Sequence, residues 1–210
     1  MSPLPSVQQH DMLYVITWFG TALCSDPTVD FIAHAHLRKD DKAFPYLFVS
    51  GPSQSPWRSS FHKRFTAPRA LPQVSITSLD ANSFSLQCVL APDRQAATGC
   101  FVCAIPGGGI EINRTSVSHW EKFVLLNAQE FTAMKEIFFV WRFRLPNGDW
   151  CQPELKEGFL LRAGHYRFKL QLVLSQSIEN SSCTSDEFAL TNINGENVTV
   201  KRDWNSNLAI

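Results

Sequence analysis

Short apolar runs recur along most of the chain, each ended by Pro, Gly, Asn or Asp, and within them apolar and polar residues alternate. In residues 29–37, for example, Phe31 and Ala33 fall on one face of an extended chain and His34 on the other. Because side chains alternate across a strand, this period predicts β-strands with one buried face. Similar runs occupy residues 13–23, 44–49, 73–77, 84–90, 100–105, 137–145, 165–174, 188–190 and 198–200. The pattern predicts about ten short strands.

One stretch has helical features instead. Residues 128–135 follow Asn127, and Glu130 stands three positions after that Asn, which is the spacing of a capping box at a helix N-terminus. Ser118 and Glu121 have the same spacing. We expect one short helix over residues 128–135.

The fold class predicted by these elements is all-β, an immunoglobulin-like β-sandwich of about ten short strands with at most one or two short helices. Gly164 and Tyr166, at the start of the run 165–174, resemble the corner that precedes strand F in immunoglobulin-like sandwiches. This resemblance favours a sandwich over a barrel. The same run, read as one long strand, points Phe168 and Leu172 into the core.

The length of 210 residues allows one large domain or two small ones. We expect a single β-sandwich domain over residues 1–210, with a basic, loop-rich segment at about 51–72. The alternative is a small β subdomain over residues 1–70 followed by an immunoglobulin-like sandwich over residues 71–204.

The composition is that of a globular protein, with 44% hydrophobic and 18% charged residues. The 19 basic residues equal the 19 acidic residues, which excludes nucleic-acid binding by bulk charge but leaves a local basic patch open. Six cysteines are too few for a disulfide scaffold at this length. The 16 Phe and 6 Trp can fill a core without disulfide or metal.

The longest apolar stretch, residues 12–24, is shorter than the roughly 20 residues of a membrane-spanning helix. No Lys or Arg precedes it, which disfavours a signal peptide. We expect no membrane insertion and an intracellular location, cytoplasmic or nuclear.

Two groups of residues have spacings found at metal sites. Cys100 and Cys103 form a C-x-x-C pair, but Phe and Val between them favour a strand, on which the two thiols point to opposite sides. His34 and His36 share one strand face and resemble the His-x-His of metal cupins, with His165 as a third histidine. We expect neither metal nor cofactor, and a cupin-like metal-dependent enzyme is the third interpretation of the chain.

A basic segment interleaved with aromatic residues is the leading candidate for a binding surface. Such a stretch suits phosphate contacts with base stacking, or aromatic anchors in a protein interface. Its candidate residues are Trp57, Arg58, Phe61, Lys63, Arg64, Phe65 and Arg69.

A second basic face is formed by Arg142 and Arg144 in one predicted strand and by Arg167 and Lys169 in another. If these strands were neighbours, four cations would crowd one side of the sheet. Like charges across strands are unfavourable, so such a face would need acidic partners or an external anion.

The segments 164–168 and 185–188 resemble the C-terminal part of the velvet DNA-binding sandwiches, relatives of Rel-type domains. This resemblance implies a nucleic-acid-binding sandwich that uses residues 57–69, which is the second interpretation. No nucleophile–base motif or phosphate loop is present, so we expect no enzymatic activity and no catalytic residues. The first interpretation is a non-enzymatic protein-interaction module that binds a protein partner or itself, possibly within a larger assembly.

Overall fold

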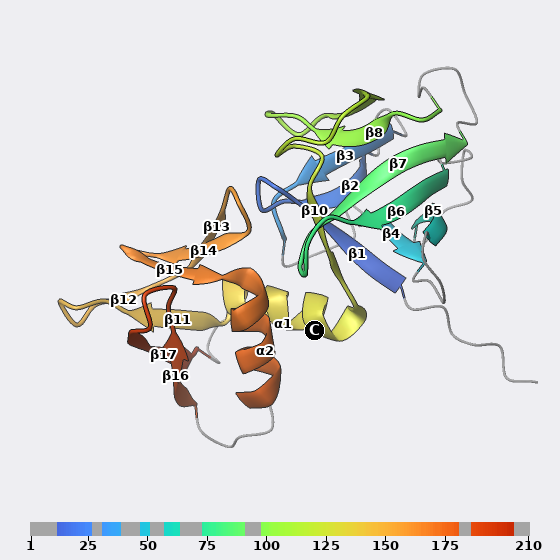
Figure 1. Cartoon of the computed structure of the whole chain (residues 1–210). Coiled ribbons are helices and arrows are strands. Elements are labelled where there is room, and N and C mark those ends of the chain that lie inside the picture. The colour runs from blue at the N-terminus through green and yellow to red at the C-terminus, as the bar shows by residue number, and fades with distance from the viewer. Residues whose placement is uncertain are drawn as a thin grey trace, which may run out of the picture.

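The computed structural model describes residues 12–26, 31–38, 47–50, 57–63, 73–90, 98–180 and 186–203 (Figure 1). These residues form seventeen strands and only two helices, so the fold is all-β, as predicted, with more and shorter strands than the sequence indicated. In the part of the chain that is described, no helix is long and apolar enough to cross a membrane.

The first ten strands form one sheet. Its order is β3-β2-β1-β4-β5-β6-β7-β8-β9, and β10 pairs with both β1 and β7. Their bounds are β1 Met12–Thr17, β2 Ala22–Asp26, β3 Phe31–Ala35, β4 Leu47–Ser50, β5 Trp57–Lys63, β6 Gln73–Ser78, β7 Phe84–Leu90, β8 Phe101–Ala104, β9 Ile110–Arg114 and β10 Phe123–Leu126.

This sheet curls into a near-barrel, called here the barrel. The two ends of the strand order, β3 and β9, meet at a bridge between Ala33 and Gly109. The backbone N–H of His34 donates to the carbonyl oxygen of Gly108 at 2.9 Å beside that bridge. Apolar side chains fill the interior, including Leu23, Val74, Leu86, Val102, Ile112, Phe123 and Leu125.

The remaining elements form the α/β part of the molecule. They comprise two helices, a four-stranded sheet of order β12-β11-β17-β16 and a three-stranded sheet of order β13-β14-β15. Their bounds are α1 Ala128–Phe139, β11 Trp141–Arg144, β12 Trp150–Cys151, β13 Glu154–Lys156, β14 Leu160–Ala163, β15 Tyr166–Lys169, α2 Leu170–Asn180, β16 Glu187–Thr191 and β17 Asn197–Arg202.

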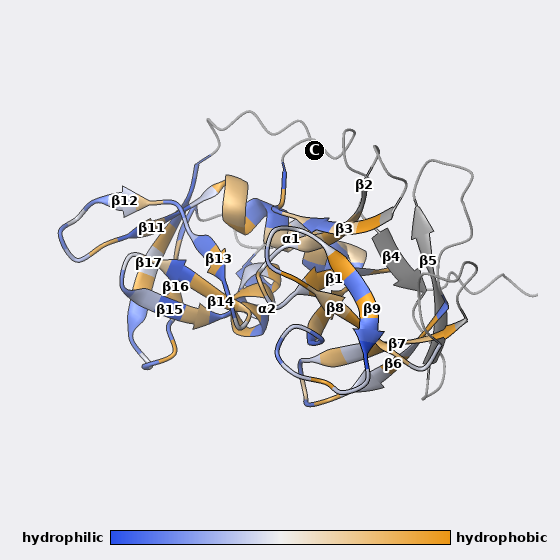
Figure 2. Cartoon of the chain, turned by 90° about the horizontal axis from the view of Figure 1, so that it is seen from above, coloured by the Kyte–Doolittle hydropathy of each residue, from blue (hydrophilic) through white to orange (hydrophobic). Residues whose placement is uncertain are grey.

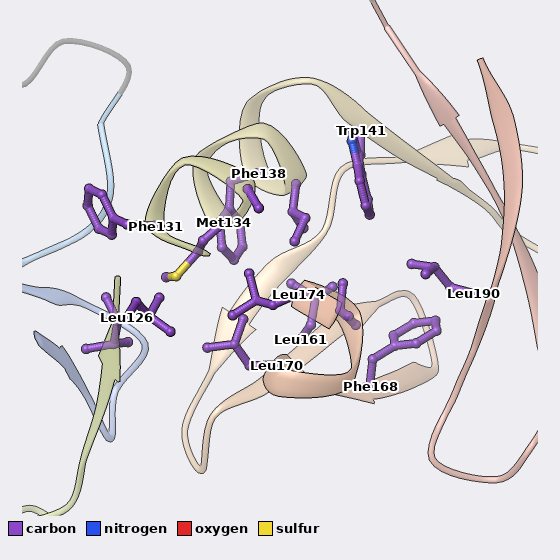
Figure 3. Packing of buried hydrophobic residues seen from close by; sticks show 14 of the residues in the cluster. Leu126, Phe131, Met134, Phe138, Trp141, Leu161, Phe168, Leu170, Leu174 and Leu190 are labelled. Carbon is purple, nitrogen blue, oxygen red and sulfur yellow. The ribbon is translucent and has the colours of Figure 1, made fainter. Parts of the chain in front are cut away.

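Strand β10 joins the barrel to the α/β part through two buried faces. Phe123 and Leu125 point into the barrel, whereas Val124 and Leu126 belong to a second core that the helices complete. In Figure 3, Met134 of α1 lies between Leu126 and the α2 residues Leu170 and Leu174. Strand β10 therefore contributes side chains to both cores and lies between them.

The hydropathy of the ribbon follows this arrangement (Figure 2). Hydrophobic segments of β1 and β8 lie toward the middle of the molecule, and the β11–β12 loop at one end is hydrophilic. That loop is a hairpin turn at Asn147 and Gly148, where Gly148 has a positive φ of 89°. Leu145 N–H donates to Asp149 O at 2.7 Å and closes the turn.

Helix α1 begins where the capping box predicts. Glu130 N–H donates to Asn127 Oδ1 at 2.9 Å, and Asn127 N–H donates to Glu130 Oε2 at 2.8 Å. The helix continues to Phe139, beyond the predicted end, so the expected strand over residues 137–145 is wrong before Val140. Ile137 fits a helical period as well as a strand period, and burial against α2 selects the helix.

The expected strand over residues 165–174 is also wrong in its second half. Strand β15 ends at Lys169, and α2 begins at Leu170. Residues 170, 173, 174 and 177 are buried, which is the spacing of a helical face. Leu172, expected in the core, is 39% exposed. The apparent strand over residues 13–23 is likewise two strands, β1 and β2, separated by a turn at Gly20.

Burial of Phe168 was predicted and is confirmed, and this generates a stability test. The ring is fully buried and meets Phe143 edge-on at 5.3 Å between ring centroids. Phe168→Ala should lower the free energy of unfolding by about 3–5 kcal/mol, because it removes apolar burial and leaves a cavity. Leu172→Ala, on the exposed side of α2, should cost less than about 1 kcal/mol. Urea unfolding of both variants measures the contrast, and equal losses would contradict the assignment of α2.

Candidate functional site

A groove runs between the barrel and the hairpin formed by β13 and β14. It consists of two connected hollows of about 580 and 280 Å³, which share His36, Leu155 and Lys156. The larger hollow reaches the glycine turn at residues 107–108, and the smaller one reaches Phe138 at the end of α1. The groove therefore lies where the barrel meets the α/β part.

The loop between β1 and β2 holds the β13–β14 hairpin against the barrel. Gly158 N–H donates to Trp18 O at 3.0 Å, and the Trp18 ring meets the Phe159 ring edge-on at 5.6 Å. Figure 1 shows this hairpin beside the blue β1–β2 loop. Leu155 fits over Gly20, where an added Cβ would stand 2.6 Å from Leu155 Cγ.

Gly20 is required here for a second reason. Its φ of 75° lies in the left-handed region, which residues with a side chain enter at a cost. Phe159 adopts a φ of 58° in the β13–β14 turn, the only non-glycine residue in the described part of the chain with a positive φ. Such strain costs on the order of 1–3 kcal/mol and persists only where packing enforces it. The hairpin is thus fixed by contacts rather than by local preference.

His34 forms part of the wall of the larger hollow, and both of its ring nitrogens are engaged. Nε2 lies 2.8 Å from Ile105 O, and Nδ1 lies 2.6 Å from Thr21 Oγ1. Thr21 Oγ1 in turn lies 2.5 Å from Thr17 Oγ1. A carbonyl oxygen can only accept, so Nε2 carries the proton and donates; in the neutral ring, Nδ1 accepts from Thr21. These bonds tie β3 to the β1–β2 loop and to the strand-end at Ile105.

Burial lowers the pKa of His34 from its ordinary value; the hydrogen bond to Ile105 opposes this shift, and the charge of His36 adds to it. The imidazole also stacks on Phe19, with 5.7 Å between ring centroids and an interplanar angle of 8°. This environment keeps the ring neutral and fixed near pH 7.

The charged groups along the groove have mixed signs. Lys156 Nζ lies 2.7 Å from Glu154 Oε2, and both side chains are exposed. The hydrogen bond and the charge of Lys156 lower the pKa of Glu154. Glu157 and His36 complete the set of ionisable groups, so the groove is not a single-sign electrostatic site.

Two extended segments border the groove along its length. Residues 153–157 all line it, as do residues 34–37. Side chains of a strand alternate between its two faces, so the consecutive lining residues show that each segment borders the two hollows with more than one face. Among the described strands, only β14 pairs with β13, so no described strand pairs with the other edge of β13.

The candidate metal histidines do not come together. His34 is satisfied by protein groups, His36 is exposed at the groove, and His165 lies against Tyr166 in the α/β part, with 4.2 Å between ring centroids. Within the described ranges, no group of three or more His, Cys, Asp or Glu side chains is placed to hold a metal ion.

Cys100 and Cys103 are buried free thiols with different surroundings, as the strand between them predicts. Cys100 belongs to the apolar interior of the barrel. Burial raises the pKa of Cys103 to about 12, and the hydrogen bond and charge of Glu121 add to the effect. The Cys103 thiol is thus protonated at neutral pH and is a poor nucleophile.

The basic aromatic segment is only partly described. Trp57, Arg58, Phe61 and Lys63 belong to β5, while Arg64, Phe65 and Arg69 lie outside the described residues. Strand β5 pairs with β6 through its first half and with β4 through its second half. Residues 57–63 of the segment expected to be loop-rich are therefore a strand, and the binding role of the segment stays a prediction.

The four cations of the second basic face do not gather. Arg142 and Arg144 are on β11, which pairs with β12 and β17, whereas Arg167 and Lys169 are on β15, which pairs with β14. Arg142 lies 3.6 Å from Asp203 Oδ2. The two strands are in different sheets, so the condition for a crowded basic face fails.

The groove itself was missed from the sequence. Its residues come from the β1–β2 loop, the end of β3, the glycine turn after β8 and the β13–β14 hairpin, and no motif connects them. Nothing in the sequence relates the turn at Pro106 and Gly107 to His36 or Lys156.

Comparison of the chain with protein-family models, with curated proteins and with solved structures found no match.

The buried imidazole generates a pH test. Because the folded state lowers the pKa of His34, the unfolded chain binds more protons, and the stability that His34 contributes is full above pH 6.5 and falls as the pH drops below it. Between pH 7.5 and pH 5.5, the wild type should lose more unfolding free energy than His34→Gln. His36→Gln, which changes the exposed neighbour, should keep most of the wild-type dependence. Urea unfolding at both pH values checks this, and parallel losses in wild type and His34→Gln would contradict it.

Proposed function

We propose that this protein is a non-enzymatic protein-interaction module that holds an extended segment of a partner protein in the groove between the barrel and the β13–β14 hairpin. The observation that carries the proposal is the lining by consecutive residues on both sides, 34–37 and 153–157. Extended segments offer backbone N–H and C=O groups at regular intervals, and a bound peptide can add to such an edge as a further strand.

The groove offers both sources of affinity that strand addition uses. Backbone groups of β13 supply hydrogen bonds that do not depend on sequence, and the hollows on either side of Leu155 receive alternate side chains. Phe19 at one end and Phe138 at the other supply apolar surface, while Lys156 and Glu157 supply charge. An extended peptide with alternating apolar and polar residues can place its side chains against these apolar and charged surfaces.

The side chains at the groove support binding rather than catalysis. Both nitrogens of the His34 ring are occupied by protein partners, so the ring is not poised to take a proton from a substrate. Lys156 is paired with Glu154. These hydrogen bonds and this ion pair fix the positions of side chains that line the groove, as a recognition site requires.

The cysteines support an intracellular location. Cys100, Cys103 and Cys151 are free thiols. Free thiols in a protein interior fit a reducing compartment. The immunoglobulin-like topology and nucleic-acid binding by residues 57–69 remain predictions beside this proposal.

A displayed library of random twelve-residue peptides tests the proposal. Peptides selected on the full chain should lose about tenfold or more of their affinity for His36→Trp, because the indole fills the junction of the two hollows. Arg38→Trp is the matched control: it adds the same bulk on the same segment, outside the groove lining. Fluorescence polarisation of labelled peptides measures both dissociation constants.

Hydrogen exchange locates the bound peptide independently. Amides of residues 154–156 should gain protection on binding, because strand addition engages backbone groups at that edge. Selected peptides that bind His36→Trp as tightly as the wild type, or protection confined to another face, would overturn the proposal. Failure to select any peptide would also overturn it. Selection of peptides derived from this chain would identify the partner as a second copy.

A further inference from the structure

A second hollow, the polar pocket, lies on the connection from β9 to β10. Its volume is about 390 Å³, and its lining consists of Arg114, Ser116, Ser118, His119, Trp120 and Glu121. It shares no lining residue with the groove, and the proposed peptide binding does not use it.

Glu121 contributes a buried carboxyl group to the lining of this pocket. The residue is only 3% exposed, and its Oε2 accepts a hydrogen bond from Ser118 N–H at 2.7 Å. No Lys, Arg or His of the described chain forms an ion pair with it. A buried carboxyl group without a directly paired cation keeps acceptor capacity, so a ligand that donates a charged hydrogen bond would be favoured here.

Arg114 presents the opposite charge. Its guanidinium and the Glu121 carboxylate both act on the pKa of the Cys103 thiol, which places the two groups around one buried atom. They are nevertheless not joined by an ion pair. The described acidic partner of Arg114 is Glu111, at 3.8 Å between Nη2 and Oε2, and the Arg114 side chain is 49% exposed. The guanidinium therefore keeps donors for a carboxylate.

An aromatic surface completes the pocket. Trp120 is 38% exposed at its rim. The His119 ring stacks on Trp18, with 4.7 Å between centroids and an interplanar angle of 12°, which holds that side of the pocket to the β1–β2 loop. Indole surface of this kind binds apolar and aromatic groups.

We propose that the polar pocket binds a small zwitterion of the α-amino-acid class, with its ammonium at Glu121, its carboxylate at Arg114 and an apolar or aromatic side chain against Trp120. A simple anion is attracted by Arg114 but repelled by the Glu121 carboxylate. A simple cation is attracted by Glu121 but repelled by Arg114. Two separate, opposite charges beside an exposed indole match a ligand that carries both charges and an apolar group.

Three probes of the same shape test the proposal on the full chain: L-phenylalanine, 2-phenylethylamine and 3-phenylpropanoate. L-Phenylalanine should bind about tenfold or more tightly than either singly charged probe, because each of those leaves one buried or half-buried charge without a partner. Isothermal titration measures the affinities, and the indole N–H resonance of Trp120, assigned with Trp120→Phe, reports the place of binding.

Variants separate the two charges. Arg114→Gln should weaken L-phenylalanine binding about tenfold and leave 2-phenylethylamine within about twofold, because the lost contact is to the carboxylate. Glu121→Gln keeps an acceptor for the Ser118 N–H. It should weaken L-phenylalanine binding about tenfold and leave 3-phenylpropanoate within about twofold, because the lost contact is to the ammonium. Arg144→Gln, an exposed arginine on β11, is the matched control and should change nothing.

Equal binding of the three probes would overturn the proposal, as would no binding of L-phenylalanine at millimolar concentration. Inorganic phosphate that binds and shifts the Trp120 resonance, without a response to L-phenylalanine, would identify an anion site instead and also overturn it. If Glu121→Gln does not fold, Arg114→Gln alone decides, because its side chain is half-exposed and outside the core.

Discussion

Strand β10 is buried on both faces, and the rest of the molecule is arranged around that constraint. Four consecutive apolar residues, 123–126, leave no face for solvent. Two of their side chains close the barrel, and the other two require a second apolar layer, which α1 and α2 supply. A strand of this kind cannot exist at the surface of an isolated barrel, because its outer face would expose apolar area to water. The barrel and the α/β part therefore stabilise each other.

The same constraint places the candidate groove. Strand β1 pairs with β10 along residues 14–17, so its end is fixed, and the β1–β2 loop projects from a rigid layer. Tyr14 of β1 stacks on Phe131 of α1, with 4.0 Å between ring centroids. The loop then holds the β13–β14 hairpin through Trp18 and Gly20. Groove walls that come from distant parts of the chain are thus positioned by one shared core.

Local pattern accounts for much of the fold, and its failures have a common cause. The capping box at Asn127 and the turn at Gly148 both depend on near neighbours, and the capping box was predicted. Residues 170–174 satisfy a strand period and a helical period at once, and only packing against α1 selects the helix. Ser118 and Glu121 have capping-box spacing, yet only the carboxylate contact forms, and a turn into β10 follows instead of a helix. Sequence alone could not decide these cases because tertiary burial decides them.

The groove could not be found in the same way, since it depends on residues that approach only in the folded chain. Thr21, His34 and Ile105 meet through hydrogen bonds between three segments. The β1–β2 loop also connects the two sites: Trp18 contacts His119 of the polar pocket and Gly158 beside the groove, and Phe19 lies between His34 and Trp120. A change at Trp18 or Phe19 would therefore disturb both hollows at once and could not assign an effect to either. His36 lines the groove only and Arg114 lines the polar pocket only, so their substitution separates peptide binding at the groove from zwitterion binding at the pocket.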